Sequence, residues 1–123
     1  MVNLEHLKYP LHFFSINYQK IKAISPVSYE EILCLEQNAK VILTDSGGIQ
    51  KEAYWLKVPC VTLRDETEWV ETLESGWNLV AGTDADLIAA AVNREPPNGN
   101  RPQLYGNGDA AEKIVDALAQ SLP

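Results

Sequence analysis

The strongest constraint on the fold is the regular alternation of short apolar runs with helical patterns. Apolar runs at 41–44, 59–63 and 78–82 are separated by stretches with helical periodicity. Strands that alternate with helices through short connections form right-handed βαβ units, in which the strands are parallel. The sequence therefore predicts an α/β fold with a parallel, Rossmann-like sheet and flanking helices.

Capping residues predict where several helices begin and end. Ser28 and Glu31 form a capping box, and the helix that they begin is expected to end near Asn38. A second helix is expected from about Gly48 to Leu56. Two more should begin at caps, at Thr67 for a helix carrying Trp69 and ending at Gly76, and within 83–86 for the next.

The outer parts of the chain fit the alternation less well. The run 20–24 is predicted to be a strand, and 11–16 is a candidate edge strand. Prolines and glycines predict a surface loop over 95–108, followed by a terminal helix over 109–121. We therefore expect residues 1–123 to form part of one nucleotide-binding domain rather than a complete fold.

Composition excludes several function classes. The 17 acidic and 10 basic residues give a net charge of −7, and most of the excess follows Cys60, which argues against nucleic acid or an anionic membrane as partner. Cys34 and Cys60 form no metal or redox motif, so we expect no metal and a cytoplasmic location. Cys60 is expected to be buried, and Tyr29, Trp55 and Trp77 are expected to pack in the core.

The run 41–44 is apolar throughout, as in a strand buried on both faces, and a glycine turn follows it. Ligands bind at the carboxyl ends of parallel strands, where the first N–H groups of the next helix lack partners. Ser46, Gly47 and Gly48 therefore fit a phosphate cradle, because glycine has no Cβ to keep a phosphate oxygen away. The alternative is a turn that needs glycine for its backbone angles, capped by Asp45 or Ser46.

Glu52 lies one helical turn after Gly48 on the same face. A phosphate at the turn would leave the rest of a nucleotide along this face, where a carboxylate can accept both ribose hydroxyls. The alternative is a surface glutamate near a helix N-terminus, where its charge is favourable.

The sequences of two segments resemble those of one family. The segment ILTDSGGIQKEAYWLKVPCVTLRDETEWVETLESGWNLVAG (42–82), with ISPVSYEEILCLEQNAKV before it, is similar to the non-hydrolysing UDP-N-acetylglucosamine 2-epimerases over about 20–94. The resemblance implies part of the C-terminal half of a two-domain, GT-B-type architecture. It also implies epimerisation at C2 of a UDP-sugar, by elimination and re-addition of UDP, with no cofactor and no metal.

The resemblance also assigns residues. It places Ser46, Gly47 and Gly48 on the UDP diphosphate and Glu52 on the ribose. It places Arg64, in the motif R-D-x-T-E, at the end of the next strand and facing the same cleft.

Two positions depart from the family pattern. The family usually continues T-E-R-P-E, whereas Trp69 here follows Glu68, and both are placed in the possible cleft. This variant resembles epimerases of UDP-2,3-diacetamido-glucuronate, so that sugar is an alternative substrate. Ile32 stands where the family often has an aromatic residue against uracil.

Nothing in the sequence corresponds to the N-terminal half of the family, which carries most of the acids and the histidine tied to catalysis. We therefore assign no catalytic residue in this portion, carry that role to neither His6 nor His12, and expect the fragment alone to be inactive. Its expected partners are a UDP-sugar and either a second copy, as a homodimer, or an N-terminal half. The alternative functions are a GT-B glycosyltransferase fragment and a non-catalytic nucleotide-binding module.

Overall fold

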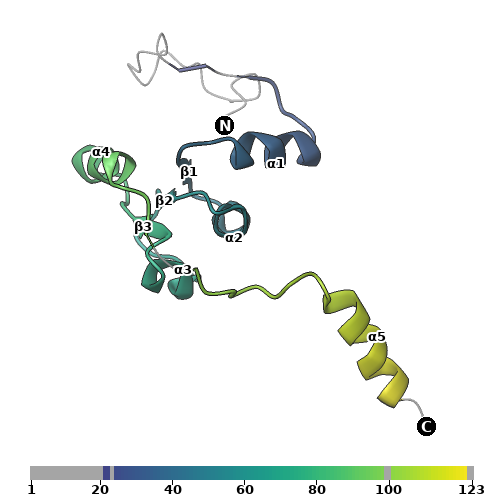
Figure 1. Cartoon of the computed structure of the whole chain (residues 1–123). Coiled ribbons are helices and arrows are strands. Elements are labelled where there is room, and N and C mark those ends of the chain that lie inside the picture. The colour runs from purple at the N-terminus through teal and green to yellow at the C-terminus, as the bar shows by residue number, and fades with distance from the viewer. Residues whose placement is uncertain (1–20, 23, 99–100, 122–123) are drawn as a thin grey trace. The chain divides into compact units, whose positions relative to one another are not determined.

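The computed structural model describes residues 21–22, 24–98 and 101–121, which contain five α-helices and three β-strands (Figure 1). By its contacts the chain divides into two compact units, Met1–Leu33 and Cys34–Pro123. Helix α1 (Tyr29–Gln37) spans the division, and the sheet lies in the second unit.

The three strands form one parallel sheet in the order β1-β2-β3, with β1 at Ile42–Thr44, β2 at Cys60–Thr62 and β3 at Asn78–Val80. The register aligns Ile42 with Cys60, and Cys60 with Asn78. The expected α/β class and parallel sheet are therefore confirmed for the described residues.

Helices cover both faces of this sheet. Helices α2 (Gly47–Leu56) and α4 (Ala85–Asn93) lie on opposite sides of the strands (Figure 1). Helix α3 (Val70–Glu74) packs against β3 and α2. The core forms two layers, one of Ile42, Ala53, Val58 and Cys60 on the side of α2, and one of Val61, Ala81 and Ala91 on the side of α4.

Burial distinguishes the central strand from its neighbours. All three residues of β2 are buried, as expected for a strand covered on both faces. The expectation of burial on both faces is wrong for β1, where Leu43 is 40% exposed. Among the described strands β1 is at an edge of the sheet, and α4 contacts β2 instead.

The capping box at the start of α1 is confirmed. The Ser28 N–H donates to Glu31 Oε2 at 2.8 Å, and the Glu31 N–H donates to Ser28 Oγ at 3.3 Å. Gly76 follows α3 in a left-handed conformation with φ of 75°, as its position at a helix C-terminus predicted. Helix α4 is capped by Asp84, whose carboxylate accepts from two N–H groups of the first turn.

Two local expectations were wrong. Thr67 does not cap α3: the N-cap position is Trp69, and Thr67 Oγ1 instead accepts from the Trp69 N–H at 3.2 Å. The described residues of the run 20–24 form no strand, and the candidate strand 11–16 lies outside the described residues.

The aromatic residues were also partly misplaced. Tyr29 is 61% and Trp55 is 50% exposed, whereas Tyr54 is buried at 2%. Trp77 is half-buried. On α2 it is Ala53 and Tyr54 that face the interior, so their neighbour Trp55 points away from it.

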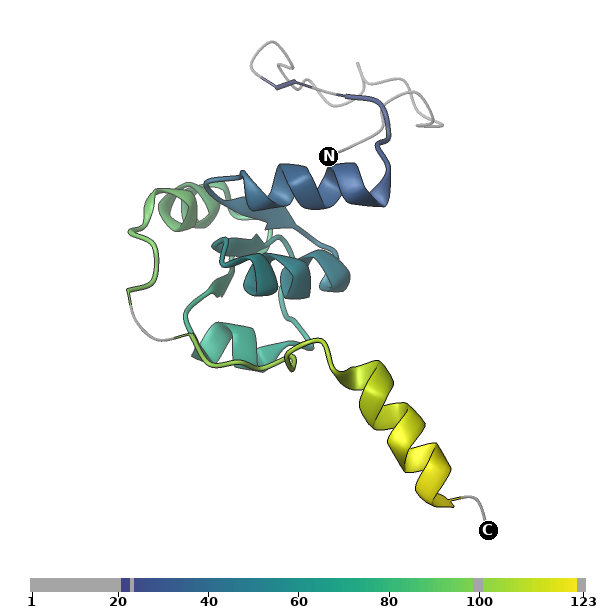
Figure 2. The ribbon, with the colours of Figure 1, turned by 45° about the vertical axis from the view of Figure 1, so that its right-hand side comes forward.

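The segment after α4 has no helix or strand among its described residues until α5 (Ala110–Ser121). The described part of it that leads into α5 lies beside α3 (Figure 2). Within this part the Tyr105 hydroxyl donates to Glu71 Oε1 at 3.1 Å. Helix α5 buries none of its residues, and Ile114, Val115 and Leu118 are exposed along one face. None of the helices among the described residues is long and apolar enough to cross a lipid bilayer.

Candidate functional site

The site is built around the start of α2, directly after β1. Ser46 has an extended backbone as the N-cap, and its Oγ accepts from the Ile49 N–H at 3.5 Å. The Ser46 N–H in turn donates to Thr44 Oγ1 at 3.0 Å, which fixes the turn to the end of the strand. The first turn of α2 has no acidic residue, so its partial positive charge is not neutralised from within the helix.

The two glycines of the turn face different surroundings. A Cβ atom placed on Gly47 would lie 3.0 Å from Nε1 of Trp69, which is too close for an ordinary contact. On Gly48 it would meet only Ser46 Oγ, at 3.7 Å. Neither glycine has a positive φ, so the turn does not need glycine for its backbone angles. The other part of that alternative, a cap at Asp45 or Ser46, is confirmed for Ser46.

Glu52 is half-buried on α2, and a second carboxylate, Glu36 on α1, lies close enough for its charge to be felt. Glu36 is only 4% exposed, and within the described residues neither carboxylate oxygen has a hydrogen-bond partner. Burial, and then the charge of Glu52, raise the pKa of Glu36. Glu36 was not among the predicted site residues, although it lies four residues after the half-buried Ile32 and therefore on the same helical face.

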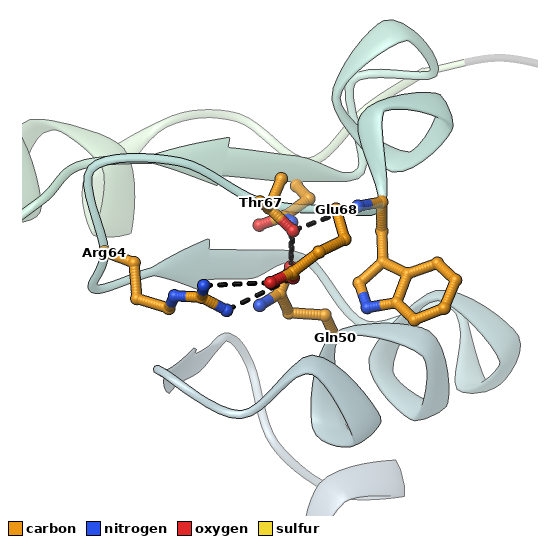
Figure 3. Close-up of polar contacts among 6 residues, drawn as sticks. Gln50, Arg64, Thr67 and Glu68 are labelled. Carbon is orange, nitrogen blue, oxygen red and sulfur yellow. Dashed lines mark hydrogen bonds and ion pairs between the residues drawn. The ribbon is translucent and has the colours of Figure 1, made fainter.

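An ion pair stands beside the start of the helix. Arg64 follows β2, and its two terminal nitrogens donate to the two carboxylate oxygens of Glu68 at 2.9 and 3.2 Å (Figure 3). The bond from Arg64 lowers the pKa of Glu68, and Glu68 raises the pKa of Arg64. Glu68 Oε2 lies 4.0 Å from the position of a Cβ on Gly47, so the pair borders the turn.

Trp69 packs against the same turn. Its Nε1 is buried next to Gly47 and has no hydrogen-bond partner among the described residues. Lys51 Nζ lies 4.1 Å from the centroid of the indole ring, and Tyr105 meets that ring edge-on at 6.3 Å between centroids. These contacts hold Trp69 over the first turn of α2.

A buried polar network underlies the loop that carries these side chains. Thr67 Oγ1 donates to Gln50 Oε1 at 2.6 Å (Figure 3), and Asn78 Nδ2 donates to the same oxygen at 3.2 Å. Asn78 also accepts from Thr62 Oγ1 at 2.9 Å. Gln50 and Thr62 are fully buried, and Asn78 is 1% exposed. The network links α2, β2 and β3 to the loop, so it positions Glu68 and Trp69 against the helix start.

The structure thus brings most of the predicted residues together. The set around the start of α2 comprises Ser46, Gly47, Gly48, Arg64, Glu68 and Trp69, and Glu52 lies one turn along the same helix. Ile32 is half-buried in the part of α1 that belongs to the first unit. Among the described residues, no three His, Cys, Asp or Glu side chains are grouped so as to hold a metal ion.

Comparison with known proteins identifies one family. The family model described as UDP-N-acetylglucosamine 2-epimerase matches residues 5–119, a longer stretch than the 20–94 suggested by the motifs. A UDP-N-acetylglucosamine 2-epimerase homolog of Methanococcus maripaludis is 50% identical over 90% of this chain and 31% of its own length. The UDP-2,3-diacetamido-2,3-dideoxy-D-glucuronate 2-epimerase of Pseudomonas aeruginosa is 42% identical over 82% of this chain and 29% of its own.

Solved structures of UDP-GlcNAc 2-epimerases also resemble this chain. The UDP-GlcNAc 2-epimerase of Methanocaldococcus jannaschii, in complex with UDP-GlcNAc and UDP, superposes with a TM-score of 0.69 at 48% identity, over 79% of this chain and 27% of that one. The UDP-GlcNAc 2-epimerase of Neisseria meningitidis bound to UDP-GlcNAc gives a TM-score of 0.59 at 32% identity. The chain therefore spans less than a third of the length of the proteins that it matches.

Proposed function

Because this chain belongs to the UDP-N-acetylglucosamine 2-epimerase family, we propose that it is the UDP-binding part of an enzyme that epimerises a UDP-sugar at C2. The chain covers 31% of the length of its relative from Methanococcus maripaludis. The proposed activity is therefore that of a longer protein, or of this chain together with a partner. The role proposed for this portion is to hold the nucleotide.

The observation that carries the proposal is Gly48. Glycine within a helix costs about 0.5–1 kcal/mol relative to alanine, yet neither packing nor backbone conformation requires glycine at this position. The open space over Gly48 is what a phosphate oxygen needs in order to approach the unpaired N–H groups. Ser46, Gly47 and Gly48 are therefore proposed to hold the diphosphate.

The proposed roles of the other residues follow from a diphosphate at the start of α2. Glu52 is proposed to accept hydrogen bonds from the ribose hydroxyls, and Ile32 to cover the base. Arg64 is proposed to act with the helix start on the diphosphate. When UDP leaves C1 of the sugar, negative charge grows on the β-phosphate, and fixed N–H donors stabilise that charge without reorganising. This chemistry draws on no cofactor and no metal ion.

A second sugar is supported by a specific residue. Trp69 replaces the arginine of the common family motif, and the similarity to the Pseudomonas aeruginosa enzyme supports a UDP-2,3-diacetamido-hexuronate as the alternative substrate. A GT-B glycosyltransferase fragment is less well supported, since the relatives reported above carry the names of epimerases or of an epimerase homolog. A non-catalytic binding module remains the alternative for the chain in isolation.

We also propose that the chain has a protein partner, either a second copy or an N-terminal half. The exposed apolar face of α5 is the surface that supports this proposal. The cytoplasmic location is proposed because both cysteines are free thiols, as is usual in a reducing compartment.

A titration followed by NMR tests the nucleotide site. UDP and uridine are added separately to the ¹⁵N-labelled chain, and the amide signals of residues 46–52 are followed. UDP should shift these amides and bind more tightly than uridine, with a dissociation constant on the order of a millimolar for a half-site. If these amides stay unmoved while UDP shifts others, the assignment is wrong.

A further inference from the structure

The ion pair between Arg64 and Glu68 has an unusual place for a surface contact. Glu68 Oε2 lies 4.0 Å from the position of a Cβ on Gly47, so a carboxylate borders the turn that is proposed to hold the diphosphate. Both terminal nitrogens of Arg64 are engaged by this one carboxylate. Arg64 therefore presents its two best donors to Glu68 rather than to the helix start.

This pairing can be exchanged at little cost. The side chains of Arg64 and Glu68 are 35% and 61% exposed, and ion pairs in contact with water contribute about 0–1 kcal/mol. A guanidinium forms the same two-bonded geometry with a phosphate that it forms with a carboxylate. A diphosphate at the helix start would also repel Glu68, since two anions would lie side by side.

We propose that Glu68 is an internal competitor of the bound diphosphate: it pairs with Arg64 in the free protein and gives Arg64 up to a nucleoside diphosphate. This inference rests on the proposed function. Glu68 then weakens binding of the diphosphate and favours its release, and Arg64 is the group for which the two anions compete.

Glu66 provides a matched control. It lies in the same loop and is exposed, and Arg64 feels its charge without a hydrogen bond between them. Glu66→Gln and Glu68→Gln therefore make the same change in net charge, but only Glu68→Gln removes the carboxylate that holds Arg64.

The experiment compares the dissociation constants of UDP and uridine for the wild-type chain and both variants, with circular dichroism as the check of folding. Glu68→Gln should lower the dissociation constant of UDP by about two- to fivefold more than Glu66→Gln does, and it should leave the dissociation constant of uridine unchanged. In a background with Arg64→Gln, this gain should disappear, because there is no arginine left to release.

The outcomes separate the inference from the proposed function. If the wild-type chain does not prefer UDP over uridine, the proposed function fails. If it does, and Glu68→Gln equals Glu66→Gln or weakens UDP, only the competitor role is overturned. A gain that persists without Arg64 also overturns it, because simple charge repulsion would then explain the effect.

Discussion

At the scale of single residues, the two thiols of the chain differ most in their contact with water. Cys34 is exposed, whereas Cys60 is 1% exposed, and burial raises the pKa of Cys60 to about 12. At about pH 8 only about one Cys60 in 10⁴ is then a thiolate, the form that reacts. Iodoacetamide should therefore modify Cys34 in the native chain and reach Cys60 only in denaturing urea. Peptide mapping by mass spectrometry checks this, and equal labelling of both in the native chain would refute it.

Glu36 offers a second prediction at this scale. Burial raises the pKa of Glu36 in the folded chain. The contribution of Glu36 to stability is therefore fully present below the pKa of about 4.3 for an unfolded glutamate, and it is lost as pH rises through the pKa of the folded chain. Glu36→Met removes the carboxylate and should raise the free energy of unfolding by about 1–3 kcal/mol at about pH 7. The gain should shrink as pH falls towards about 4.

Urea unfolding of both proteins at several pH values measures this gain. Glu112→Met on α5 is the control, because Glu112 is an exposed glutamate in a helix. A gain for Glu36→Met that is constant with pH would show that packing, and not the buried charge, is responsible.

At the scale of elements, the start of α2 allows its two glycines to be tested separately. Gly48→Ala adds a methyl group in open space, so it should leave the fold intact or stabilise it by up to about 1 kcal/mol while weakening UDP and not uridine. Gly47→Ala places its methyl 3.0 Å from Trp69 Nε1, so it should destabilise the chain and displace the indole. Thermal unfolding and the UDP titration measure both effects.

The two variants are therefore expected to change the stability of the chain in opposite directions, and Gly48→Ala is expected to weaken UDP binding without a loss of stability. If Gly48→Ala stabilises the chain and binds UDP as well as the wild type does, a phosphate does not approach Gly48. That result would remove the observation on which the phosphate cradle at Gly48 is proposed.

Elements with strong local signals were predictable from the sequence. Helix α2, predicted at about 48–56, spans Gly47–Leu56, and the three predicted strands 41–44, 59–63 and 78–82 contain β1, β2 and β3. Their apolar runs and capping residues depend on neighbours in the chain, which a sequence reveals.

Side-chain placement was harder to predict because it depends on tertiary contacts. Gln50 has a polar side chain at a fully buried position, where its Oε1 accepts hydrogen bonds from Thr67 and Asn78, which lie in other parts of the chain. The expectation that Thr67 caps α3 failed for the same reason, since its hydroxyl is taken by Gln50 and by the Trp69 N–H. The residues of the glycine turn were predictable, but the network that positions their neighbours was not.

At the scale of the whole molecule, α5 leaves an apolar surface exposed. Ile114, Val115 and Leu118 are each about 60% exposed, and apolar faces of this kind commonly mark an interface. We predict that the chain forms a homodimer through α5, and that Val115→Lys shifts it towards the monomer. Light scattering over a range of concentrations measures the mass, with Glu112→Gln as the control for the same change of net charge on the same helix. A wild-type chain that is monomeric throughout would contradict the prediction.

The last prediction concerns catalysis by the chain alone. Inversion at C2 requires a base positioned to remove a proton, and such a group contributes typically 10²–10⁴ in rate. The groups around the start of α2 suit an anion, and the chain spans 31% of its Methanococcus maripaludis relative, so most of a full-length enzyme has no counterpart here. We therefore expect the chain to bind UDP but not to exchange the C2 proton of UDP-GlcNAc for deuterium in D₂O. NMR of the sugar measures this exchange, with a full-length relative as the positive control. Exchange at a rate comparable to that control would mean that this chain contains its own base. UDP binding without exchange would separate holding the nucleotide from acting on the sugar.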